Sequence, residues 1–114
     1  MKMTIQELIT DSHQIALSKG WWENKERNIG ELLALVHSEI SEALEVYRDH
    51  GVDGLSKIWL GDNNKPEGFT VELADAVIRI VDLCAGFDLD LEEALRTKMD
   101  FNRSRPHRHG GKIA

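Results

Sequence analysis

Two pairs of acidic residues lie inside stretches of the sequence that otherwise read as apolar helices. Glu39 and Glu42 form the first pair, and Glu72 and Asp75 form the second. An ionised carboxylate is costly to remove from water unless a cation compensates its charge. Four carboxylates gathered in one apolar interior therefore favour a bound metal ion.

The inference of a metal ion rests on the direction in which these side chains point around each helix, because their spacing alone does not support it. Acids occupy 20 of 114 positions, and roughly three pairs of acids three residues apart are expected by chance at this frequency. Glu39 falls within the apolar arc of the helix predicted over residues 28–50, Glu42 lies at its edge, and Glu45 projects outside it. The arc consists of Leu32, Leu35, Val36, Ile40, Ala43, Leu44, Val46 and Tyr47.

The helix predicted over residues 69–85 is apolar around about two thirds of its circumference. Its charged residues are Glu72, Asp75, Arg79 and Asp82. A helix this apolar is buried on several sides, so its charged strip must face a lined cavity or a second subunit. We expect Asp82, like Glu45, to lie at the surface or to support the metal ligands from outside the site.

An internal network of ion pairs is the alternative, with Arg79, Lys98 or Arg103 neutralising the acids. Arg79 alone does not balance four carboxylates. Oxygen-only ligands indicate a hard divalent ion, and Mg²⁺ is the natural candidate, with Mn²⁺ as a substitute. A carboxylate-bridged di-iron centre would need Glu-x-x-His pairs, and no histidine here follows a glutamate by three residues.

Composition limits the class of protein. With 114 residues, 41% of them hydrophobic, the chain fits one domain over residues 1–114. A net charge of -6 disfavours binding to a nucleic-acid polymer. A single cysteine, Cys84, and the lack of a signal peptide or a membrane-spanning run lead us to expect a cytoplasmic protein without membrane contact.

The hydrophobic period predicts an all-α fold, a bundle of four to five helices. We expect helices over residues 4–18, 28–50, 69–85 and 90–103, with caps at Asn28 and Asp90. Residues 51–68 collect turn formers and predict a long loop, with at most one helical turn around residues 55–59. Residues 104–114 form a basic tail that we expect to be mobile.

Three runs of the sequence carry a family resemblance: ALVHSEISEALEVYR, KPEGFTVELADAVIRIVDLC and KMDFNRSRPHRHGGK. In this order and spacing they resemble the all-α nucleoside triphosphate pyrophosphohydrolases of the MazG type, over roughly residues 30–112. The resemblance implies a dimer or tetramer that cleaves a nucleoside triphosphate to monophosphate and pyrophosphate. It implies that Glu39, Glu42, Glu72 and Asp75 hold Mg²⁺, and that Lys98, Asn102 and, less securely, Arg103 contact phosphate.

The reaction chemistry agrees with this assignment. Cleavage at the α-phosphorus builds negative charge on the phosphoryl group and on departing pyrophosphate, which divalent ions stabilise. We expect a metal-activated water as nucleophile, with Glu42 or Glu45 accepting its proton. Cations of the tail are candidates to close over the triphosphate: Arg105, Arg108 and Lys112.

Aromatic residues are the remaining binding candidates. Trp21, Trp22 and Trp59 lie in or beside connections, where a ring can stack on a nucleobase. The alternative is that these rings only seal the ends of the bundle. We expect His13, His37 and His50 to be surface or capping residues.

Two other functions remain open from the sequence. The first is a hydrolase with a narrow nucleotide substrate, such as dUTP, dCTP or a nucleotide with an oxidised base. The second is a non-enzymatic helical oligomer, in which acidic strips pair with basic strips of a second copy.

Overall fold

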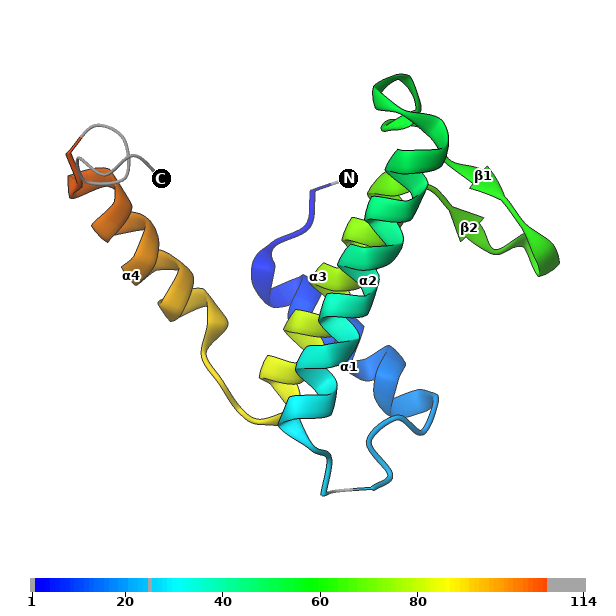
Figure 1. Cartoon of the computed structure of the whole chain (residues 1–114). Helices are drawn as coiled ribbons and strands as arrows, with labels where there is room; N and C mark the ends of the chain where they lie inside the picture. The colour runs from blue at the N-terminus through cyan, green and yellow to red at the C-terminus, as the bar shows by residue number, and fades with distance from the viewer. Residues whose placement is uncertain (1, 25, 107–114) are drawn as a thin grey trace.

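The structure is a computed structural model that describes residues 2–24 and 26–106, and this part of the chain is mostly helical. Its α-helices are α1 (Ile5–Ser18), α2 (Ile29–His50), α3 (Phe69–Gly86) and α4 (Leu91–Ser104) (Figure 1). Two 3-10 turns, η1 (Val52–Gly54) and η2 (Asp62–Asn64), and two short strands, β1 (Trp59–Leu60) and β2 (Pro66–Glu67), lie between α2 and α3. The prediction of an all-α chain is confirmed at this level.

Side-chain caps place the starts of three helices. The Thr4 hydroxyl accepts the backbone N–H of Glu7, and the Glu7 carboxylate accepts the N–H of Thr4 in return. Asn28 caps α2 and Asp90 caps α4, each by accepting the N–H three residues on. These bonds satisfy N–H groups that the first turn of a helix leaves without partners. The predicted starts of these helices therefore agree closely with the structure.

The connection between α2 and α3 is more ordered than the sequence suggested. β1 and β2 pair antiparallel with Trp59 opposite Glu67. Asn63 and Asn64 both have left-handed φ values, 58° and 59°, which asparagine tolerates and a tight turn requires. The sequence allowed at most one helical turn, around residues 55–59; in the structure a turn forms earlier, in η1, and Trp59 belongs to β1.

The core lies where α2 and α1 pack against α3 (Figure 1). Small residues such as Ala43 on α2 and Ala76 on α3 are buried, so these helices approach closely. The helix α4 stands apart from the other three. The remaining core residues are Ile9, Ala16, Leu32, Val81 and Cys84.

Large apolar residues stay exposed along α2 and α3. On α2 they fall within one arc that runs the length of the helix, which we call the α2 stripe: Ile29, Leu33, Ile40, Leu44 and Tyr47. On α3, Val77 and Ile80 are 45% and 40% exposed. The expectation that this helix is buried on several sides was therefore wrong for a single chain, because α2 and α1 leave part of its surface uncovered.

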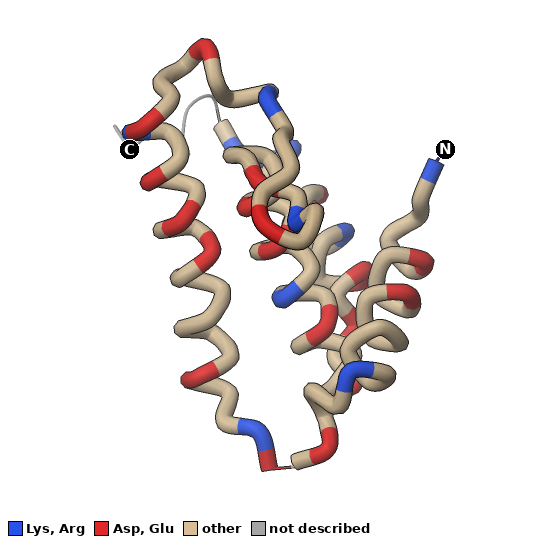
Figure 2. Tube along the Cα trace, turned by 90° about the vertical axis from the view of Figure 1, so that its right-hand side faces the viewer, with Lys and Arg blue, Asp and Glu red and all other residues tan. Residues whose placement is uncertain are grey.

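Charged residues are spread over the trace. Figure 2 shows acidic positions along every helix, whereas basic positions are fewer and α1 has none. Within residues 2–24 and 26–106, no helix combines the length and the apolar character needed to cross a membrane.

Candidate metal centre

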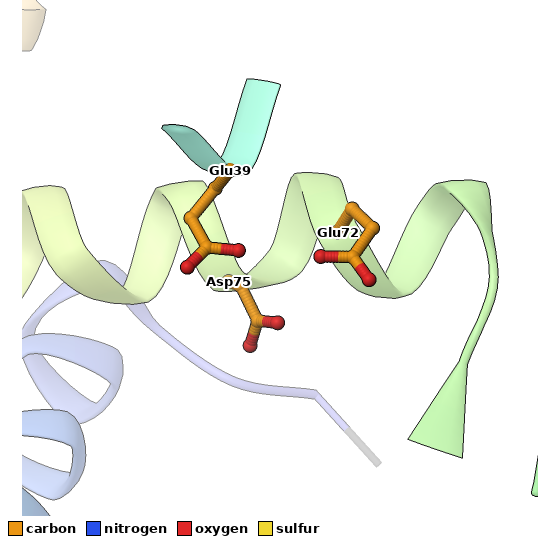
Figure 3. Close-up of side chains that lie close together, drawn as sticks. All are labelled: Glu39, Glu72 and Asp75. Carbon is orange, nitrogen blue, oxygen red and sulfur yellow. The ribbon is translucent and has the colours of Figure 1, made fainter. Parts of the chain in front are cut away.

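Three carboxylates converge between α2 and α3. Glu39 comes from α2, and Glu72 and Asp75 come from one face of α3 (Figure 3). One oxygen from each lies within 4.8 Å of the others. Glu39 is only 7% exposed, and the other two are half-buried. This arrangement can hold a divalent cation through oxygen ligands.

The packing of the two helices explains this convergence. Glu72 and Asp75 are three residues apart, so both lie on the same side of α3. Glu39 lies within the buried face of α2, because it is four residues from Ala43, a residue that packs in the core. The contact between α2 and α3 thus brings an acid of one helix to the two acids of the other.

Only part of the negative charge is neutralised by the protein. The Arg79 Nε donates to Glu39 Oε1 at 2.9 Å. The Glu72 Oε2 atom is buried and, among the described residues, has no hydrogen-bond partner. A buried acceptor without a partner is costly, so it fits a cation ligand better than a completed ion-pair network.

The other cations of the ion-pair alternative lie elsewhere. Lys98 and Arg103 are on α4, which stands apart from α2 and α3. Arg103 pairs with Asp100 on its own helix, and the Lys98 ammonium lies 5.2 Å from the centre of the Phe101 ring. Neither cation compensates the three acids within this chain.

The electrostatics of the acids reflect this imbalance. The pKa of Glu72 is raised to about 7, mainly by burial and then by the adjacent carboxyl of Glu42. Burial likewise raises the pKa of Asp75, with the charge of Glu39 next, while Arg79 opposes the shift. Near neutral pH the cation-free site therefore retains a proton, which a bound metal ion would displace.

A cavity of about 340 Å³ adjoins the acids. Glu42 lines it together with Glu39 and Asp75, whereas Glu45 is 63% exposed and lies 3.6 Å from Arg48. The structure thus distinguishes Glu42 from Glu45, the two candidate proton acceptors between which the sequence did not decide. The other lining residues are Trp21, Lys65, Ile78 and Arg79.

Lys65 was missed by the sequence reasoning. It lies in the connection, directly before β2, and it lines the cavity. The charge of Lys65 also lowers the pKa of Asp75. The available signal was its position in the run KPEGFT, just before the helix that carries Glu72, although no periodicity assigned it to the site.

The three tryptophans have different environments. Trp21 is 49% exposed and lines the cavity beside the acids. The Trp22 ring packs edge-on against His13 and Phe87. Trp59 donates to Glu67 at 3.0 Å and lies against the His50 ring. Of the three, only Trp21 is placed beside the candidate metal centre.

The remaining candidate ligands for phosphate are not brought to the cavity. Asn102 lies with Lys98 and Arg103 on α4. Arg105 follows this helix, and its guanidinium lies 5.7 Å from the centre of the Phe101 ring. Arg108 and Lys112 lie outside the described residues.

A second cavity, of about 360 Å³, is lined by Trp21, Ile78 and Arg79 as well. Asp82 also lines it and is only 6% exposed. Its carboxylate accepts from Trp22 Nε1 and is 2.8 Å from His13 Nδ1. The expectation that Asp82 lies at the surface was therefore wrong, because α1 packs over this part of α3. His13 remains partly exposed but contacts Asp82, a partner that the sequence did not indicate. The other lining residues are Arg27, Leu32 and Leu83.

Comparisons of the chain with family models, with curated proteins and with solved structures gave no match.

The raised pKa of Glu72 predicts how stability depends on pH without metal. Between about pH 4.5 and about pH 7 the folded state holds a proton that the unfolded state has released. The free energy of unfolding therefore falls as pH rises through this window. Glu72→Gln removes this contribution. In urea unfolding, the free energy of unfolding of this variant should exceed that of wild type by more above pH 7 than below pH 4.5.

Glu45→Gln is the matched control, because Glu45 is an exposed glutamate on α2 that lies outside the group of three acids. It should follow the wild-type pH profile, and Mg²⁺ should narrow the difference between Glu72→Gln and wild type above pH 7. An equal difference between Glu72→Gln and wild type at both pH values would contradict the placement of Glu72.

Proposed function

We propose that this chain is a Mg²⁺-dependent nucleotide pyrophosphohydrolase, which cleaves a nucleoside triphosphate, ribo or deoxy, to the monophosphate and pyrophosphate. The observation that carries the proposal is the convergence of Glu39, Glu72 and Asp75 with too little positive charge beside them. The buried Glu72 Oε2, which has no hydrogen-bond partner among the described residues, supports a cation there. The sequence resemblance supplies the reaction.

Charge in the cavity beside the acids suits a metal-bound polyphosphate. Three lining acids, Glu39, Glu42 and Asp75, face two lining bases, Lys65 and Arg79. A divalent ion held by the carboxylates would offset this negative charge and would stabilise the charge of the phosphates. The two bases would then bind the non-bridging oxygens of the substrate. Mn²⁺ can replace Mg²⁺ in an oxygen-ligand site of this kind.

Glu42 is the proton acceptor in this proposal. It lines the cavity that would hold the phosphates, whereas Glu45 points to solvent beside Arg48. A carboxylate must lie within hydrogen-bond reach of the attacking water to accept its proton. The charge of Glu42 also raises the pKa of Glu72, so Glu42 acts on the metal centre as well as on the cavity.

Trp21 is the residue that we assign to the nucleobase. It lines both cavities, so it lies between the acids and the space beside Asp82. A base stacked on its ring would gain about 1–3 kcal/mol. Trp22 and Trp59 are each engaged by neighbouring side chains, through Asp82 and Glu67 respectively.

Self-association completes the proposal. The α2 stripe exposes large apolar side chains along a whole helix, a pattern that marks interaction surfaces. The helix α4 has 14 residues, and an isolated helix of this length is only marginally stable without a packing partner. We place the α2 stripe in the interface of a dimer or tetramer, in which Lys98 and Asn102 reach the triphosphate from the α4 of a second copy.

The reaction is tested by identifying the first product released from a panel of nucleoside triphosphates. Wild type should release pyrophosphate only when Mg²⁺ or Mn²⁺ is present. Glu39→Gln and Asp75→Asn should each lower kcat/KM by roughly 100-fold or more, the effect of losing one group that stabilises transition-state charge. Glu45→Gln should retain wild-type activity.

Orthophosphate as the first product would contradict cleavage at the α-phosphorus. A chain that turns over no triphosphate and binds no metal, and whose Glu39→Gln variant is more stable, would instead be the non-enzymatic helical oligomer.

Light scattering coupled to size exclusion tests self-association. Wild type should elute with the mass of a dimer or tetramer, and Leu33→Glu with Leu44→Glu should give a monomer, because each places a charge in the α2 stripe. Ser41→Glu is the matched control, since Ser41 is exposed on the same helix outside the stripe. A monomeric wild type at the concentration used for activity would contradict the assembly.

A further inference from the structure

The cavity beside Asp82 does not include the metal centre, but it shares lining residues with the cavity that adjoins the three acids. Asp82 follows Asp75 by seven residues, which is two turns along the same face of α3, or about 10 Å. Trp21, Ile78 and Arg79 line both cavities and so join them. The second cavity measures about 360 Å³, within the range of about 300–1,000 Å³ typical of ligand sites.

The lining of this cavity suits a flat ring with a polar edge. Leu32, Ile78 and Leu83 supply apolar walls, and Trp21 supplies a half-exposed aromatic ring. The one carboxylate in the lining is that of Asp82. A polar group placed among apolar walls can orient a ligand through its hydrogen bonds.

Of the two arginines in the lining, Arg27 contacts other protein groups, and Arg79 faces the metal centre, where the proposed function assigns it to phosphate. Arg27 Nη1 donates to the Trp21 carbonyl oxygen at 2.9 Å, and its guanidinium lies 4.8 Å from the centre of the Trp22 ring. Arg79 donates to Glu39, on the side of the metal centre. Asp82 is therefore the charged group best placed to read the edge of a ligand in this cavity.

The Asp82 carboxylate keeps capacity to accept further hydrogen bonds. Oδ1 receives Trp22 Nε1 at 3.0 Å and lies 2.8 Å from His13 Nδ1. Among the described residues, Oδ2 receives only Trp22 Nε1, also at 3.0 Å. An ionised carboxylate offers about four acceptor positions. His13 and Trp22 thus fix the orientation of the carboxylate while leaving Oδ2 able to accept from a ligand.

We infer that this cavity binds the nucleobase and that Asp82 selects bases presenting an N–H donor to it, such as an exocyclic amino group. The inference rests on the proposed nucleotide substrate and names its class. A base with a carbonyl at the same position would place an acceptor against a buried carboxylate, so the carbonyl would find no donor there and the two oxygens would repel each other. Discrimination should be roughly 10–100-fold, the range for one hydrogen bond to a charged group.

The test uses nucleosides without phosphate and without metal, so it does not depend on hydrolysis. The indole N–H signals of Trp21 and Trp22 are followed by NMR during titration with two isosteric pairs: deoxycytidine against deoxyuridine, and deoxyadenosine against deoxyinosine. In at least one pair the amino nucleoside should bind roughly 10–100-fold more tightly than its carbonyl counterpart. Asp82→Asn, which replaces one acceptor oxygen by a donor, should abolish or reverse this preference.

Trp21→Ala serves as the matched control, because it should weaken both members of a pair equally through lost stacking. His13→Gln leaves the Asp82 carboxylate in place and should keep the direction of the preference. Equal binding within both pairs, a preference for the carbonyl nucleosides, or no binding by wild type would overturn the inference. The wild-type comparison decides even where Asp82→Asn does not fold. If wild type released pyrophosphate in a Mg²⁺-dependent reaction but bound both members of each pair equally, this inference would be wrong and the proposed function would stand.

Discussion

The packing of α2 against α3 is the contact on which the rest of the structure depends, because it forces like charges together. Buried alanines let the two helices approach closely, and this approach brings Glu39 to Glu72 and Asp75. Arg79 compensates one of these acids, and a proton on Glu72 relieves part of the remaining repulsion. The helix pair is thus built around a charge imbalance that a divalent cation would remove.

The polar strip of α3 organises the space on either side of this contact. Asp75 faces the acids, Arg79 follows one turn later, and Asp82 lies one turn beyond that. A nucleotide lying along this strip would place its phosphates near the acids and its base beside Asp82. Trp21 lies at the junction of the two cavities, held there in part by the bond from Arg27 to its carbonyl oxygen.

Helical phase made part of the site predictable. Glu39 lies within an apolar arc and Glu72 interrupts an apolar helix, so their burial follows from sequence and geometry. The caps at Asn28 and Asp90 were equally readable, because capping is local. The positions of Lys65 and Asp82 in the cavities could not be predicted in this way. The first reaches the site through a hairpin, and the second is buried by residues more than 50 positions away in sequence, a relation that no local pattern encodes.

Calorimetric titration of the chain with Mg²⁺ at pH 7, in two buffers of different ionisation enthalpy, tests the central claim most directly. The structure predicts saturable binding accompanied by proton release, because the pKa of Glu72 is raised to about 7 and a metal ion displaces that proton. Glu72→Gln should remove the buffer dependence and weaken binding. If neither Mg²⁺ nor Mn²⁺ gave binding heat in either of the two buffers, the assignment of these carboxylates as a metal centre would be contradicted.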